Sequence, residues 1–131
     1  MDILDYGGLL ALNCTYTGNK VITAFRIWLK LHNEHEWECI HPETGEKAHP
    51  IHVFGDLCRH SGITSTYSPK CIRALAYMML AEFYISNGWD SDAKYCVSVV
   101  ENISCSGYTL CKQLIIDCKE EVQEIKRRLN E

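Results

Sequence analysis

The sequence lacks any cluster of positive charge that could bind nucleic acid. It contains 13 Lys and Arg residues against 17 Asp and Glu residues, which gives a formal net charge of -4. A surface that binds nucleic acid needs grouped cations that displace the counterions around the phosphates. The basic run at residues 126–128 falls at the end of a predicted helix, where cations offset the helix dipole. We therefore expect no nucleic-acid partner.

Long apolar runs are also missing from the chain. No stretch approaches the roughly 20 apolar residues that a membrane-spanning helix needs, and the N-terminus lacks the basic start and apolar run of a secretory signal. We therefore expect a cytoplasmic protein that does not associate with membranes. With 131 residues, of which 47% are apolar and 23% charged, the chain is expected to fold as a single domain over residues 1–131.

Motifs typical of enzymes are absent as well. No glycine-rich loop could cradle a phosphate, and no Cys or Ser stands in a glycine-rich elbow or beside a recognisable base. The eight cysteines mostly stand at helical spacing among Leu, Ile and Val, which favours buried core thiols over a disulfide scaffold, although the sequence leaves their redox state open. We expect no enzymatic activity and no cofactor.

The alternative hypothesis is a small helical protein stabilised by zinc. Six residues with ligating side chains lie between positions 39 and 60: Cys39, His41, His49, His52, Cys58 and His60. Zinc prefers four thiolate or imidazole ligands, but structural sites pair them at spacings such as C-x₂₋₄-C, and this chain contains no CxxC. We favour exposed loop histidines beside a core cysteine and predict no metal ligands, while metal binding remains the alternative.

Apolar residues recur at helical spacing along most of the chain. The pattern predicts a weak helix over 3–17, a second helix over 21–32, and a short helix that begins at Pro50 and ends before Gly62. A polar loop around 41–50 separates the second helix from the third. Further helices are predicted from Ser68-Pro69 to about residue 87, from a cap at Asp90 or Ser91 to about residue 102, and over 108–129. The fold class is therefore all-α.

The segment 73–102 carries the most specific pattern in the chain. Its apolar, small and turn residues stand at the spacings of one tetratricopeptide repeat: Tyr77, Leu80, Ala81, Tyr84, Gly88, Ala93, Val97 and Val100. A weaker copy begins the chain at Leu10-Ala11. The segment resembles a helix-turn-helix unit of the tetratricopeptide family, with Trp89 in place of an aromatic residue that the family has at position 90. The resemblance implies antiparallel helix hairpins, closed by a C-terminal capping helix over 108–129.

The same resemblance implies a function in binding another protein. Tetratricopeptide-like hairpins hold a partner helix or peptide in a groove that is lined mainly by the first helix of each hairpin. The predicted partner-binding residues are Tyr77, Met78, Glu82, Phe83, Trp28 and Trp89. We expect a chaperone or adaptor, which could also form a homo- or hetero-oligomer through the C-terminal helix.

Two short stretches of the first third resemble a particular group of such chaperones. Residues 9–11, reading LLA, and residues 17–29, reading TGNKVITAFRIWL, look like the opening of the tetratricopeptide-type chaperones that hold the needle subunit in bacterial type III secretion. This resemblance implies a cytoplasmic chaperone whose concave face holds an amphipathic helix until export.

Overall fold

The computed structural model describes residue 22 and residues 25–30, 39–41, 44–62 and 67–130, and it divides the chain into two compact units, 1–66 and 67–131. Most of the described residues are helical, and the only strands among them are one pair of two-residue strands, so the expected all-α class is confirmed. The helix predicted over 3–17 lies outside the described residues, and so does the Leu10-Ala11 pair that begins the weaker copy of the repeat pattern. Most of the residues in 17–24 also lie outside them.

In the first unit, an aromatic cluster joins two helical segments. Residue 22 and residues 25–30 are helical, as predicted for this part of the chain. Phe25 is fully buried, and its ring lies 5.9 Å from that of Trp28 and 4.7 Å from that of Phe54. Phe54 belongs to α3 (Pro50–Ser61), which therefore shares its apolar face with the helical turn at 25–30.

The start and the end of α3 agree with the sequence. Pro50 stands in the first turn, where its fixed φ suits a helix and its missing N–H costs no hydrogen bond. Gly62 ends the helix with φ of 82°, a conformation that glycine adopts without a steric penalty. The N-cap was not predicted: His49 accepts a hydrogen bond at Nδ1 from the backbone N–H of Ile51, at 3.1 Å.

A short β-hairpin occupies part of the loop that was predicted around 41–50. Strands β1 (Cys39–Ile40) and β2 (Lys47–Ala48) pair antiparallel, with Cys39 opposite Ala48 and Ile40 opposite Lys47. Gly45 turns the chain between them with φ of 73°. Strands of two residues carry too few alternating positions to be recognised by their pattern, which explains why the sequence did not predict them.

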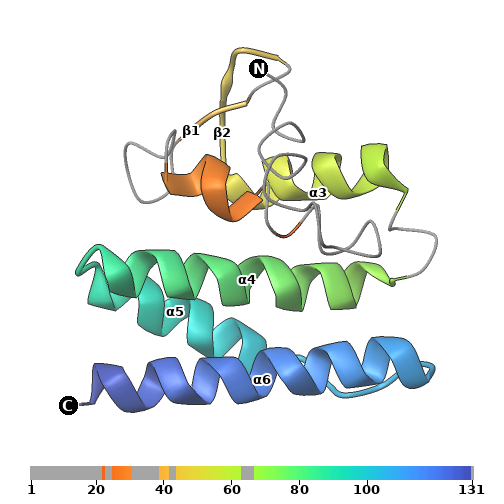
Figure 1. The fold of residues 1–131 in the computed structure, drawn as a ribbon, viewed down its shortest axis with the longest axis vertical. Helices are drawn as coiled ribbons and strands as arrows, with labels where there is room; N and C mark the ends of the chain where they lie inside the picture. Colours follow the sequence, from red (N-terminus) through yellow and green to blue (C-terminus); the bar gives the residue numbers. More distant parts are fainter. Residues whose placement is uncertain (1–21, 23–24, 31–38, 42–43, 63–66, 131) are drawn as a thin grey trace. The chain divides into compact units, whose positions relative to one another are not determined.

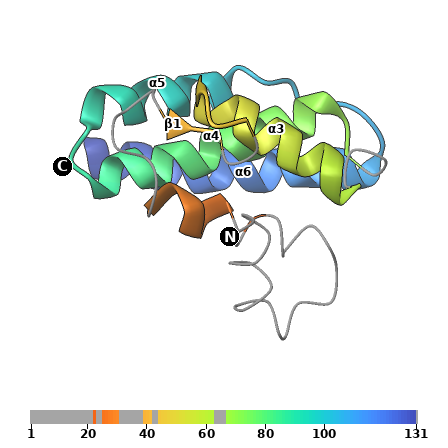
Figure 2. The same ribbon diagram turned by 90° about the horizontal axis from the view of Figure 1, so that it is seen from above.

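The second unit consists of three consecutive helices, α4 (Pro69–Ser86), α5 (Asp90–Glu101) and α6 (Thr109–Leu129), each of which packs against the other two. Figures 1 and 2 show that α5 runs back along α4 and that α6 runs in the same direction as α4. As a result, the first turns of α4 and α6 lie at the same end of this unit.

Helix α4 forms the most deeply buried part of the second unit. Ser68 caps it by accepting a hydrogen bond from the backbone N–H of Cys71, and Pro69 occupies the first turn, as predicted. Ten of its 18 residues are buried, and Leu80, Ala81 and Tyr84 have no exposed surface. Helix α4 is therefore the centre of the core of this unit.

Helix α5 differs from the sequence prediction in its cap. Gly88 reverses the chain with φ of 77°, but the N-cap is Trp89, whose side chain makes no capping hydrogen bond. Asp90 and Asp92 stand in the first turn instead, where their negative charges favour the positive end of the helix dipole. The prediction that Asp90 or Ser91 caps this helix is wrong, because the helix begins at Asp90 itself.

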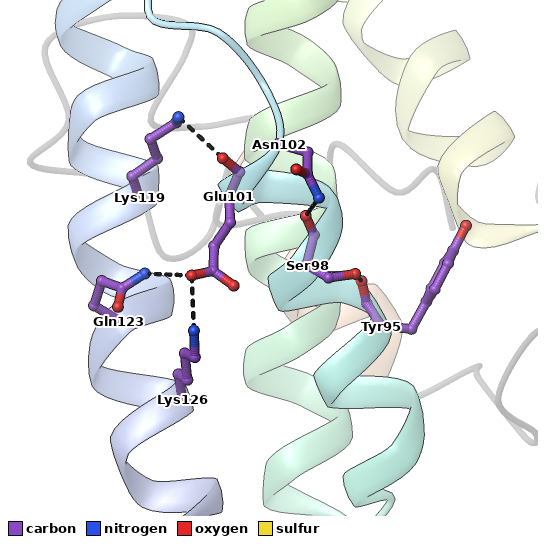
Figure 3. Close-up of polar contacts among 7 residues, drawn as sticks. All are labelled: Tyr95, Ser98, Glu101, Asn102, Lys119, Gln123 and Lys126. Carbon is purple, nitrogen blue, oxygen red and sulfur yellow. Dashed lines mark hydrogen bonds and ion pairs between the residues drawn. The ribbon is translucent and has the colours of Figure 1, made fainter.

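Helix α6 packs through a narrow seam of buried residues at steps of three and four. The five buried residues of this helix are Cys111, Ile115, Cys118, Val122 and Ile125. Beside the seam, Glu101 at the end of α5 links to three side chains of α6, as Figure 3 shows. Its carboxylate accepts hydrogen bonds from Gln123 at 3.0 Å and Lys126 at 3.1 Å, and its backbone carbonyl accepts one from Lys119 at 3.2 Å.

Candidate partner-binding site

The six residues predicted to bind a partner occupy different environments. Trp28 belongs to the first unit, where it is 2% exposed. The other five lie on the hairpin of α4 and α5. Tyr77 and Met78 are each only 7% exposed, and Glu82, Phe83 and Trp89 are half-buried.

Phe83 and Trp89 come together at the turn between α4 and α5. Their ring centroids are 5.9 Å apart, and Trp89 also lies 5.9 Å from the buried ring of Tyr84. The backbone N–H of Trp89 donates to the carbonyl of Tyr84 at 2.9 Å, which fixes the turn against the end of α4. Edge-to-face and tilted aromatic pairs of this kind add stability beyond the area they bury. Trp89 therefore packs into the hairpin, as the sequence suggested for this aromatic residue.

A second aromatic group lies further along the hairpin and includes an exposed ring. Tyr77 of α4 and Tyr95 of α5 meet edge to face, with ring centroids 6.2 Å apart and planes at 74°. The guanidinium carbon of Arg73 lies 4.8 Å from the centroid of the Tyr77 ring, within the range of a cation–π interaction. Tyr95 is 52% exposed, and Figure 3 shows it projecting from the side of α5 that faces away from α6. We call Arg73, Tyr77 and Tyr95 the Arg–Tyr–Tyr patch.

The environment of Tyr77 keeps its phenol neutral, and Arg73 places a guanidinium beside the ring. Burial raises the pKa of Tyr77, and the hydrogen bond between its hydroxyl and Tyr95 acts in the same direction, while the charge of Arg73 opposes both effects. The phenol therefore stays protonated at neutral pH. The patch therefore presents two packed tyrosine rings with the exposed guanidinium of Arg73 beside them.

Sequence reasoning missed Tyr95 as a surface residue. The apolar residues of this helix are Ala93, Tyr95, Cys96, Val97, Val99 and Val100, and their composition alone does not distinguish Tyr95 from the buried positions. In the structure Cys96, Val97 and Val100 are buried, whereas Tyr95 is more than half exposed. Tyr95 precedes Cys96 by one residue, a step of about 100° around the helix, which moves it out of the buried stripe. Assigning each residue its angle around the helix axis, instead of counting apolar residues, could have placed Tyr95 at the surface.

Comparisons of the chain with protein-family models, with curated proteins and with solved structures give no match. What this chain binds is therefore inferred from the geometry and chemistry of its own residues.

Several residues of the proposed zinc set have other interactions. His41 is 5% exposed, and its Nε2 donates to the Asp56 carboxylate at 2.7 Å, while Asp56 also pairs with Arg59. His49 caps α3, as described above. Cys58 is fully buried, and burial raises the pKa of its thiol to about 12, as for a core cysteine.

Within the part of the chain that the structure describes, no three His, Cys, Asp or Glu side chains converge on a position that could hold a metal ion. The side chains of Cys39 and His60 lie outside that part. The described helices also include none that is long and apolar enough to cross a membrane.

Proposed function

We propose that the chain is a non-enzymatic chaperone or adaptor that binds a partner protein through a tetratricopeptide-like unit over residues 67–131. In this proposal α4 and α5 are the two helices of one repeat, and α6 caps the repeat as the first helix of a second one would. The parallel course of α4 and α6, with α5 running back between their ends, supports this arrangement. Ala81 and Ala93, both without exposed surface, supply the small side chains that such a hairpin requires.

The exposure of Tyr95 carries the functional part of the proposal. A tyrosine that is 52% exposed yet packed against a second ring offers contact area whose conformation is already fixed. Binding then loses little side-chain entropy, which is the reason that tyrosine is enriched among residues that dominate binding energy. The Arg–Tyr–Tyr patch is therefore the proposed contact surface.

The chemistry of the patch defines the kind of partner. An apolar side chain fits the exposed face of Tyr95, and a carboxylate fits the guanidinium of Arg73, which can pair with it in a bidentate geometry. An amphipathic helix or an extended peptide presents both groups a few residues apart. We therefore propose a partner segment with an apolar anchor and a nearby Asp or Glu.

A displayed library of random peptides tests this proposal. The full chain is immobilised for selection, and binding of the enriched peptides is then measured by calorimetry. We expect the enriched sequences to share an apolar residue and an acidic residue at a constant spacing. Tyr95→Ala should weaken their binding at least about tenfold, because loss of a central aromatic contact costs on the order of 1–2 kcal/mol or more. Arg73→Gln should weaken acidic peptides selectively.

The matched control is Tyr108→Ala, because Tyr108 is a second tyrosine with a comparable exposure of 57% that lies outside the patch. This variant should bind the selected peptides as the unmodified chain does. If the library yields no shared motif, or if Tyr95→Ala binds every selected peptide with unchanged affinity, the proposed contact surface is wrong.

A further inference from the structure

Two cysteines that are 40 positions apart in the sequence meet where α4 and α6 begin. Cys71 lies in the first turn of α4 and Cys111 in the first turn of α6. The Sγ of Cys71 donates to the backbone carbonyl oxygen of Cys111 at 3.4 Å, so the two residues are in direct contact. Both residues are buried, with exposed fractions of 0% and 1%. They form a pair of buried cysteines that pack against each other.

The surroundings shift the pKa values of the two thiols in opposite directions. Burial acts to raise the pKa of Cys111, but hydrogen bonds from the Tyr108 hydroxyl, from Ser68 and from Cys71 outweigh it, so this pKa lies below its usual value. Burial raises the pKa of Cys71, and its hydrogen bond to Cys111 adds to this effect. Cys111 is therefore the sulfur that is more readily ionised, and Cys71 is its protonated neighbour.

The hydroxyl of Tyr108 agrees with this assignment. Its hydrogen bond to Cys111 raises the pKa of Tyr108 to about 12, as expected for a hydroxyl that donates to a sulfur anion. Ser68 Oγ donates to the Sγ of Cys71 at 3.3 Å, which opposes the rise in the Cys71 pKa only in part. Neither α4 nor α6 has an acidic residue in its first turn, so no carboxylate there opposes a negative sulfur.

The connection between α5 and α6 passes beside Cys111, because a Cβ at Gly107 would lie 3.7 Å from the Cβ of Cys111. Ser104 and residues 106–108 of this connection are exposed. Lys70, next to Cys71, holds this connection through hydrogen bonds from its Nζ to Ser104, at 2.6 Å, and to Ser106. A small oxidant can therefore reach the sulfur atoms after a local opening of this connection, without unfolding of the helices.

We propose that Cys71 and Cys111 are a redox-active dithiol that a hydroperoxide converts to a reversible intramolecular disulfide. The site is independent of the Arg–Tyr–Tyr patch and shares no residue with it. A hydroperoxide is the class of oxidant that fits, because it is small enough to reach a buried sulfur after a local opening of this connection.

The chemistry proceeds in two balanced steps. The Cys111 thiolate attacks one oxygen of the peroxide, the O–O bond breaks, and Cys111 becomes a sulfenic acid while hydroxide, or an alkoxide, leaves and takes up a proton. The Cys71 sulfur then attacks the Cys111 sulfur, the S–O bond breaks, and water leaves with the Cys71 proton. Two thiols have lost two electrons, and the peroxide has gained them. A small dithiol reverses the change by exchange and is itself oxidised to its disulfide.

Mass spectrometry of the full chain tests the proposal. The reduced protein is treated with a small excess of hydrogen peroxide at pH 7, remaining thiols are blocked with N-ethylmaleimide, and the product is digested with trypsin. Cleavage after Lys70 and Arg73 isolates Cys71, whereas residues 95–112 contain Cys96, Cys105 and Cys111 together. We expect a disulfide-linked species of these two peptides, with fragment ions that place the bond at Cys111. Dithiothreitol should return both thiols.

Three variants separate the mechanism from general thiol reactivity. Tyr108→Phe removes a donor to Cys111 and should slow disulfide formation at pH 7 several-fold, because the thiolate fraction falls. Glu121→Gln, an exposed change on α6 far along the helix from Cys111, should leave the rate unchanged. In Cys71→Ser, dimedone should trap a sulfenic acid at Cys111.

The peptide map of the unmodified chain decides the matter even if a variant fails to fold. A bond from Cys71 to Cys96 or Cys105, or a sulfinic acid at Cys111 beside a free Cys71 thiol, would overturn the proposal. An unchanged rate in Tyr108→Phe would contradict the role of Cys111 as the attacking sulfur.

Discussion

His49 caps α3 with an imidazole, a task that Ser, Thr, Asp or Asn usually performs. Its Nδ1 accepts the hydrogen bond from Ile51 only while that nitrogen carries no proton. Burial lowers the pKa of His49, and the nearby His52 lowers it further. The unfolded chain therefore binds a proton at this residue more readily than the folded chain does.

This difference predicts a loss of stability in acid. As the pH falls below the ordinary histidine value of about 6.5, protonation favours the unfolded state, so the contribution of His49 is present at higher pH and disappears on acidification. We expect Tm to fall between pH 7.5 and pH 5.5 in thermal unfolding followed by circular dichroism. His49→Asn supplies a cap that does not titrate and should reduce this fall. An identical decrease in Tm for both proteins would contradict the interpretation.

At the scale of elements, Glu101 links the end of α5 to the side of α6. Hydrogen bonds from Gln123 and Lys126 lower the pKa of Glu101, and burial opposes them only in part. The carboxylate is partly exposed to water, so solvent screens the attraction and the gain is small.

Glu101→Gln should therefore lower the free energy of unfolding by about 0.5–1 kcal/mol at neutral pH. Chemical denaturation in urea measures this difference. The contribution should also decrease when the pH drops below the ordinary glutamate value, because a carboxyl group with a lowered pKa stabilises the folded state only while it is ionised. Glu121→Gln, on the exposed side of α6, is the control and should change the stability little. A larger loss in the control would refute the proposed link.

The helix boundaries were the most predictable part of the fold. Pro50 and Pro69 begin helices and Gly62 and Gly88 end them, because each of these residues has strong local conformational preferences. The pairing of β1 with β2 was not predictable, since it depends on contacts that short strands do not encode. The cap at Trp89 could not be predicted either, because packing against Tyr84 replaces the usual side-chain hydrogen bond there.

At the scale of the whole molecule, stability should be greatest where burial is most complete. Helix α4 has the largest number of buried residues among the described helices, and the connection between α5 and α6 is exposed. We expect the amides of α4 to exchange slowest in hydrogen–deuterium exchange, and those of 104–108 and of the last turn of α6 to exchange fastest. Exchange in α4 as rapid as in the last turn of α6 would show that the buried helix opens locally.

The candidate sites were much less predictable than the helices. Sequence spacing correctly indicated that Cys71 and Cys111 are core residues, but their contact joins positions that only the packing of α4 against α6 brings together. The same is true of Tyr77 and Tyr95, which come from two helices and meet through the geometry of the hairpin. Periodicity reports which residues are buried, and it does not report which buried residues of different helices touch.

The consecutive packing of α4, α5 and α6 also has a kinetic consequence. Each helix of this unit contacts neighbours that are near in sequence, and folds dominated by such local contacts reach the native state quickly, on the order of microseconds to milliseconds. Five of the six cysteines whose environment is described become buried in the folded chain. Rapid folding shortens the time during which these thiols are exposed together after synthesis, and it thereby limits the formation of incorrect disulfides before the thiols are buried.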